Sequence, residues 1–209
     1  PTIVNTLFGC ILLANSASLA RPLDGALAEF VADGTSLCVR ESASEATVQA
    51  LRAGTADVGI VSDAVDTRGL HCLELGPDPL VLVTAPGHPL AGQHGASFGQ
   101  ALAHLWIAWG EHGALATHLH LRAAALGLPI RAVVGHPDVA TVVGLVARDV
   151  GVTVLPRALV EHPTQAGAVV ATPLREPWAA RRLLVCHADG GTPQCGRLAA
   201  ALQRGWPER

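Results

Sequence analysis

One continuous stretch, residues 41–63 (ESASEATVQALRAGTADVGIVSD), does most to restrict the possible folds of this chain. It predicts a loop, a helix, a tight turn and a buried strand. Ser42 and Glu45 have the S-x-x-E spacing of a helix capping box. Gly54 suits the end of that helix, where the backbone turns to positive φ. The apolar run at 58–61 is typical of a strand covered on both faces, so the stretch predicts a helix-strand unit of an α/β fold.

The polar residues at the two ends of this stretch suggest a binding site. Ser62 and Asp63 follow the strand, and residues 42–44 start the helix. In open α/β sheets, ligands bind at the carboxyl ends of the strands, where helix N-termini also offer free N–H groups. The alternative is an ordinary helix-strand unit without a site, because the pattern is common in α/β proteins.

Composition excludes several classes of protein. The chain has 209 residues and a net charge of -3, and its 14 basic residues are all arginine. This balance offers no basic face for nucleic acid, and no apolar run approaches the roughly 20 residues of a membrane helix. Five cysteines without a C-x-x-C pair indicate neither a zinc site nor a disulfide framework, and dispersed free cysteines favour the cytoplasm. We therefore expect a cytoplasmic protein with no metal site, cofactor or membrane partner.

Predicted strands and helices alternate along the chain, which indicates an α/β fold with mostly parallel sheets. They divide into two lobes, residues 1–77 with 169–209 and residues 78–168. The predicted strands cover 8–14, 36–40, 58–61, 70–75, 80–84, 105–109, 130–134, 151–155, 169–173 and 183–187. The predicted helices cover 19–30, 42–54, 98–103, 115–126, 139–148 and 194–204.

Three strings, in order, resemble the effector-binding domain of LysR-type transcriptional regulators. They are ALRAGTADVGIVSD (50–63), LGPDPLVLVTAPGHPLAG (75–92) and VVGLVARDVGVTVLPRALV (142–160). The resemblance extends over residues 8–205. It departs at Asp149, where the family usually has glycine, but aspartate tolerates a left-handed backbone better than most residues.

The resemblance implies a type 2 periplasmic-binding-protein fold, with two lobes joined by two crossing strands and a small effector between them. It also implies an antiparallel homodimer, with the tetramer as a further assembly of a full-length regulator. DNA would be bound only by an N-terminal winged helix-turn-helix, which this chain lacks. Because the chain begins at Pro1 and contains no methionine, we expect it to be processed or part of a longer protein.

The same resemblance, motif by motif, places the effector site on segments from both lobes. Hydroxyls and helix N-termini at these positions favour a small anion with one negative charge rather than two. The candidate effector-binding residues are Ser16, Ser18, Ser42, Ser44, Ser62, Trp109, His112, Gly113, Leu115, Asp138, Val139 and Thr153.

For Trp109 and His112, a role in binding and a purely structural role are both possible. Trp109 offers a flat apolar wall and one N–H donor, or it packs in the core at the end of a strand. His112 can donate to an anion, or it is an exposed loop histidine. His118 and His120 project from different sides of one predicted helix, so they do not form a metal site.

The sequence predicts a sensing domain rather than an enzyme. It contains no G-x-S-x-G elbow, and Cys10, Cys38 and Cys186 lie in apolar runs typical of core cysteines. The alternative function is a free-standing solute-binding protein of a transporter with the same fold, which would act as a monomer.

Overall fold

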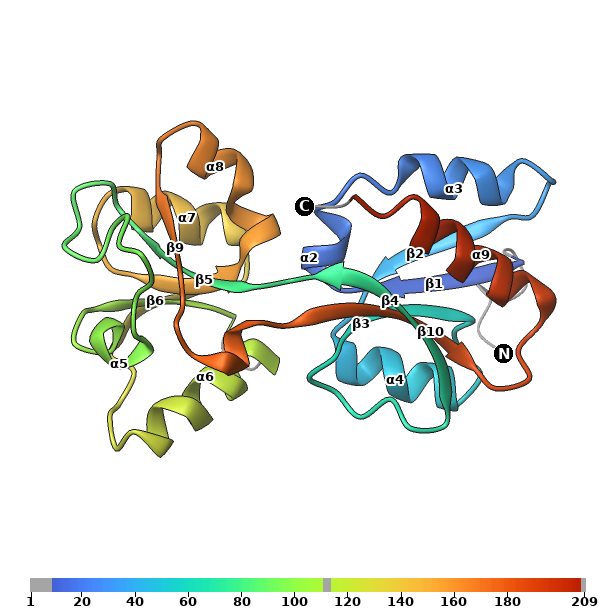
Figure 1. Cartoon of the computed structure of the whole chain (residues 1–209), viewed down its shortest axis with the longest axis horizontal. Helices are drawn as coiled ribbons and strands as arrows, with labels where there is room; N and C mark the ends of the chain where they lie inside the picture. Colours follow the sequence, from blue (N-terminus) through green and yellow to red (C-terminus); the bar gives the residue numbers. More distant parts are fainter. Residues whose placement is uncertain (1–8, 111–113, 208–209) are drawn as a thin grey trace. The chain divides into compact units, whose positions relative to one another are not determined.

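The computed structural model describes residues 9–110 and 114–207, and it divides the chain into two compact units (Figure 1). Unit 1 contains residues up to 78 and from 181 onward, and unit 2 contains residues 79–180. The chain therefore passes between the units twice. The prediction that 169–180 belongs to the first lobe is wrong. Strand β9 (Val170–Pro173) pairs with β5 (Leu80–Thr84), so this segment stays in unit 2.

Unit 1 is built on one five-stranded sheet. Its order is β2 (Leu37–Glu41), β1 (Cys10–Ala14), β3 (Val58–Ser62), β10 (Arg182–Ala188) and β4 (Leu70–Pro77). Strand β1 pairs in parallel with β2 and β3, whereas β10 is antiparallel to both β3 and β4. The sheet is thus mixed, not mostly parallel as predicted. The chain returns from unit 2 and inserts β10 between β3 and β4, which both run opposite to it.

Helices cover both faces of this sheet (Figure 1). Helices α3 (Asp24–Val31) and α9 (Pro193–Arg204) bury one face, and α4 (Ser44–Arg52) buries the other. Gly59 permits the close approach of α4, since a Cβ there would lie 2.4 Å from Cγ2 of Thr47. The predicted helix-strand unit is present as α4 and β3, and Gly59 allows the two to pack closely.

Two details of the predicted helices are wrong. The single helix expected over 19–30 is two, α2 (Ser16–Leu19) and α3, because Pro22 interrupts the chain between them. The expected capping box of Ser42 and Glu45 does not form. The N-cap of α4 is Ala43 in an extended conformation, and it makes no side-chain capping hydrogen bond.

The cysteines are not all free, contrary to the sequence-based expectation. Cys72 on β4 and Cys186 on β10 face each other in the antiparallel register and form a disulfide. The three cysteines without a disulfide are Cys10, Cys38 and Cys195. Strand register, which a cysteine count does not contain, brings the pair together across 114 residues of sequence.

Unit 2 contains two smaller sheets. Strands β8 (Thr153–Pro156), β5 and β9 form an antiparallel sheet, and β6 (Trp106–Trp109) pairs in parallel with β7 (Ala132–His136). The antiparallel sheet again departs from the mostly parallel arrangement predicted. The helical segments of this unit are α5 (Phe98–Ala101), α6 (Ala114–Ala125), α7 (Val139–Ala147), η1 (Arg157–Val160), α8 (Glu161–Gln165) and η2 (Pro177–Ala179).

Asp149 follows α7 with φ of 58°, so the aspartate adopts the left-handed turn that the sequence predicted it could. Among the helices that the structure describes, none has the length and apolar character needed to cross a membrane.

Candidate functional site

One edge of the unit 1 sheet collects polar side chains from every strand. Strands β1, β2, β3 and β4 run in the same direction and end at this edge, and β10 begins there. Parallel strands leave their carboxyl ends on one side of a sheet, which is where ligands bind in α/β folds. Five of the predicted site residues lie at this edge, and they are Ser16, Ser18, Ser42, Ser44 and Ser62.

The two serines after β1 are already engaged within the protein. Ser18 is fully buried and donates its hydroxyl hydrogen bond to Oδ1 of Asn15, 2.8 Å away, so it fixes the start of α2. Ser16 donates from its hydroxyl to the carboxylate of Glu41 at the end of β2. A carboxylate therefore already occupies part of the edge where the sequence predicted a free anion site.

Of the three serines around α4, Ser44 and Ser62 are buried and Ser42 is partly exposed. Ser44 is buried, and its Oγ accepts a 3.1 Å hydrogen bond from the backbone N–H of Ser62, which ties α4 to β3. Ser62 accepts at its own Oγ from the N–H of Ala64, 3.3 Å away. The hydroxyl of Ser42 donates a long hydrogen bond of 3.4 Å to the carbonyl of Ala43, and its backbone N–H donates to the carbonyl of Ala14 at 3.0 Å. Helix α4 begins without a side-chain cap, and Glu45 already places a negative charge in its first turn.

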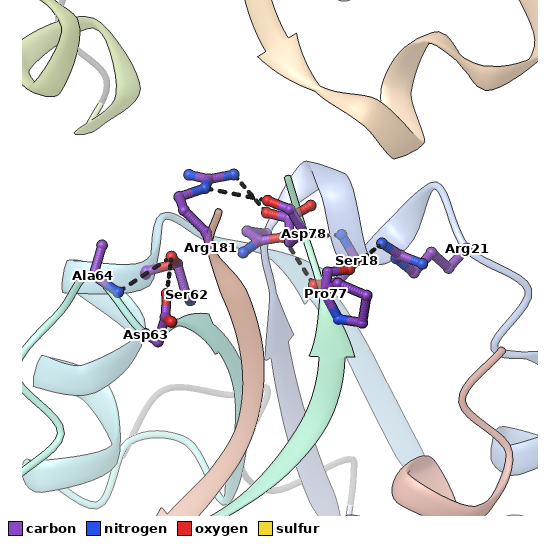
Figure 2. Close-up of polar contacts among 10 residues, drawn as sticks. Ser18, Arg21, Ser62, Asp63, Ala64, Pro77, Asp78 and Arg181 are labelled. Atoms are coloured by element: carbon purple, nitrogen blue, oxygen red, sulfur yellow. Dashed lines mark hydrogen bonds and ion pairs between the residues drawn. The ribbon is translucent and has the colours of Figure 1, made fainter. Parts of the chain in front are cut away.

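A buried ion pair at the same edge was missed by the sequence reasoning. Asp78 follows β4 and is fully buried, and Arg181 immediately precedes β10 with a side chain only 16% exposed. Nη2 of Arg181 lies 2.5 Å from Oδ2 of Asp78. Figure 2 shows this pair at the end of the sheet that also carries Ser18 and Ser62. The edge therefore holds an arginine in addition to the predicted serines.

Asp78 is held in an environment that disfavours its charge. Burial raises the pKa of its carboxyl, although the guanidinium groups of Arg181 and Arg21 act in the opposite direction. Asp63 raises the same pKa further by its negative charge. Oδ1 of Asp78 is buried without a hydrogen-bond partner in the described part of the chain. Arg21 is anchored separately, since Nη2 donates to the carbonyl of Pro77 and its guanidinium lies over the ring of Trp206.

In unit 2, three predicted site residues line one apolar pocket. Trp109 at the end of β6, Leu115 on α6 and Thr153 on β8 all contribute to it. The indole N–H of Trp109 donates to the carbonyl of Pro137, 2.9 Å away. Trp109 is half-buried and packs against the core of unit 2, and its one donor is used internally.

The remaining predicted residues give a mixed result. Asp138 caps α7, because its carboxylate accepts from the N–H and the hydroxyl of Thr141 at 2.8 and 2.7 Å. The hydroxyl of Thr141 is the main cause of the lowered pKa of Asp138. Val139 begins α7. This helix start thus already holds an anion, its own aspartate, and does not offer the free N-terminus that was predicted. His112 and Gly113 lie outside the described residues.

Within the described residues, no group of three or more histidine, cysteine, aspartate or glutamate side chains is arranged to hold a metal ion. The donors at the unit 1 edge are serine hydroxyls, backbone N–H groups and the guanidinium groups of Arg21 and Arg181.

Comparison with known proteins identifies the family. Residues 14–207 match the LysR substrate binding domain. The chain belongs to this family. A protein described as a "Probable hydrogen peroxide-inducible genes activator" from Mycobacterium avium is 28% identical over 177 residues, which are 81% of this chain and 55% of that protein. The chain thus spans about half the length of this LysR-type relative.

Solved effector-binding domains share the fold. The effector-binding domain of BenM with its effector benzoate has a TM-score of 0.74 and 16% identity, covering 96% of this chain and 95% of that one. The effector-binding domain of QuiR in complex with shikimate has a TM-score of 0.75 and 17% identity, covering 94% of this chain and 96% of that one. The LysR fold expected from the sequence, similar to type 2 periplasmic binding proteins, is confirmed, with mixed sheets.

Proposed function

We propose that this LysR domain is the effector-sensing part of a bacterial transcriptional regulator, and that its effector is a small organic anion with one negative charge. The observation that carries the proposal is the family match over residues 14–207, joined to the polar edge of unit 1. Benzoate and shikimate, the ligands of two similar domains, are both monocarboxylates.

The electrostatics of the edge support one negative charge rather than two. The carboxylates of Glu41 and Asp63 already lie there, and each accepts a hydrogen bond from a serine hydroxyl, Ser16 and Ser62 respectively. A dicarboxylate would place two further negative charges beside these carboxylates, whereas a monocarboxylate places one. Arg21 contributes charge but is anchored to the backbone of Pro77 and to a ring.

Sensing requires that the effector bind one state of the protein better than another. We propose that these states differ in the packing of a homodimer, as the family resemblance implies, and that DNA is bound by a separate N-terminal domain of the whole regulator. That the effector lies between the two lobes stays a prediction from the same resemblance. We further propose that the domain acts in the cytoplasm and has no catalytic activity.

The alternative function, a solute-binding protein of a transporter, is affected by two observations. The disulfide between Cys72 and Cys186 removes the argument based on free cysteines. The match to a regulator family nevertheless supports the sensing function, because it extends over nearly the whole chain.

A binding measurement tests the proposal. Thermal unfolding is followed with increasing benzoate or shikimate, and sodium chloride at equal ionic strength serves as the control. A ligand present at about 100 times its Kd stabilises the folded domain by roughly 2.7 kcal/mol. We expect at least one of the two acids to raise the Tm beyond the chloride control. Failure of both would contradict the monocarboxylate proposal.

A further inference from the structure

The guanidinium of Arg181 is held in a fixed orientation by its contacts with Asp78. Two of its nitrogens face one residue, since Nη2 lies 2.5 Å from Oδ2 of Asp78 and Nε lies 3.5 Å from the backbone carbonyl of the same residue. The backbone N–H of Asp78 donates to the carbonyl of Arg181 at 2.8 Å. The two residues are therefore linked by main chain and side chain, which restricts the orientation of the guanidinium.

This orientation leaves part of the arginine available. Asp78 is fully buried, whereas 16% of the Arg181 side chain is exposed, so the solvent-facing member of the pair is the cation. Nη1 of Arg181 makes none of the contacts with Asp78 described above. An arginine whose planar group is already fixed loses little entropy when it binds a carboxylate.

Its position at the edge places this donor among the predicted site residues. Leu183 pairs with Ser62 in the antiparallel register, and the N–H of Asp63 donates to the carbonyl of Arg182 at 2.9 Å. Residue 181 therefore lies where β3 ends. Figure 2 shows the guanidinium of Arg181 at this end, between the β3 terminus with Ser62 and Asp63 and the segment with Asp78.

We infer that Arg181 is the carboxylate-binding residue of the effector site, and that Asp78 is a positioning residue that holds its guanidinium. The inference rests on the proposed function, because it assigns a role within that same site. Charge-assisted hydrogen bonds from a guanidinium to a carboxylate are stronger than those from a serine hydroxyl. Arg181 therefore sets the preference for a carboxylate over an uncharged ligand.

The test compares a carboxylate with its neutral amide. The affinities of benzoate and benzamide, and of shikimate and its amide, are measured by titration calorimetry on the wild-type chain. We expect Arg181→Lys, which keeps a positive charge beside Asp78 but loses the planar fork, to weaken carboxylate binding about tenfold and to leave amide binding unchanged. The matched control is Arg182→Lys, because Arg182 pairs with Glu74 on the exposed surface, and this variant should bind as the wild type does.

A double variant keeps the test decisive if the lysine of Arg181→Lys still binds the carboxylate of the ligand. Arg181→Gln combined with Asp78→Asn replaces the ion pair by a neutral pair of similar size, and the preference for carboxylate over amide should then disappear. If wild-type, Arg181→Lys and double-variant proteins all bind the carboxylate equally, the role of Arg181 is wrong and the proposed function stands. If neither carboxylate binds the wild type, both the monocarboxylate proposal and this inference are overturned.

Discussion

Replacing Cys72 and Cys186 together by alanine is expected to lower the free energy of unfolding by roughly 2–5 kcal/mol. The disulfide closes a loop with a sequence separation of 114 residues, and cross-links over long loops restrict the unfolded chain most. It also joins β4 to β10, the two strands whose ends carry Asp78 and Arg181. We therefore expect its loss to loosen the pairing of β4 with β10.

Denaturant unfolding with and without dithiothreitol measures this effect. The wild-type midpoint should fall in dithiothreitol, whereas the midpoint of the double alanine variant should not respond. Cys38→Ala provides the control, because Cys38 is a half-buried free cysteine on β2, and this variant should retain the full response to reductant. A wild-type midpoint that is the same in both conditions would show that the two thiols are not paired.

Replacing Arg181 alone by glutamine is expected to cost about 3–5 kcal/mol at pH 8, because it leaves the buried carboxylate of Asp78 without its partner. The loss should be smaller at pH 5. Burial already raises the pKa of Asp78, and removal of the cation raises it further. A carboxyl with a raised pKa in the folded state favours folding at low pH, and that contribution is lost as the pH rises through the folded-state pKa.

Two further variants identify the source of the loss. Asp78→Asn in the Arg181→Gln background removes the unpaired charge and should restore most of the stability. Arg182→Gln breaks a half-exposed pair with Glu74 and should cost no more than about 1 kcal/mol. Equal stability of Arg181→Gln and wild type at pH 8, measured by urea unfolding, would show that the buried pair does not form.

The local parts of the fold could be predicted because they depend on short-range patterns. The apolar run of β3, the glycine turn at Gly54 and the left-handed Asp149 all follow from neighbouring residues. The capping box failed because α4 begins at Ser44, so that Ala43 and not Ser42 is the N-cap. Ser44 is recruited by the N–H of Ser62, a contact across 18 residues that sequence spacing does not contain.

The ion pair and the disulfide could not be predicted because each depends on the placement of β10. Asp78 lies between two prolines, and the string reads as a break in structure rather than as a buried acid. Its partner Arg181 is 103 residues away and meets it only after β10 has inserted between β3 and β4. The one signal for the ion pair in the sequence is the charge of Asp78 at the boundary between the two units.

The central claim, that a monocarboxylate binds at the polar edge of unit 1, is tested most directly by NMR. Backbone amide shifts of the isotope-labelled chain are recorded while benzoate or shikimate is added. We predict that the largest shift changes in unit 1 fall at residues 15–18, 42–45, 62–64 and 181–182. Changes confined to the outer surface of α3 and α9, where Glu29 and Arg204 form an ion pair, would contradict the claim.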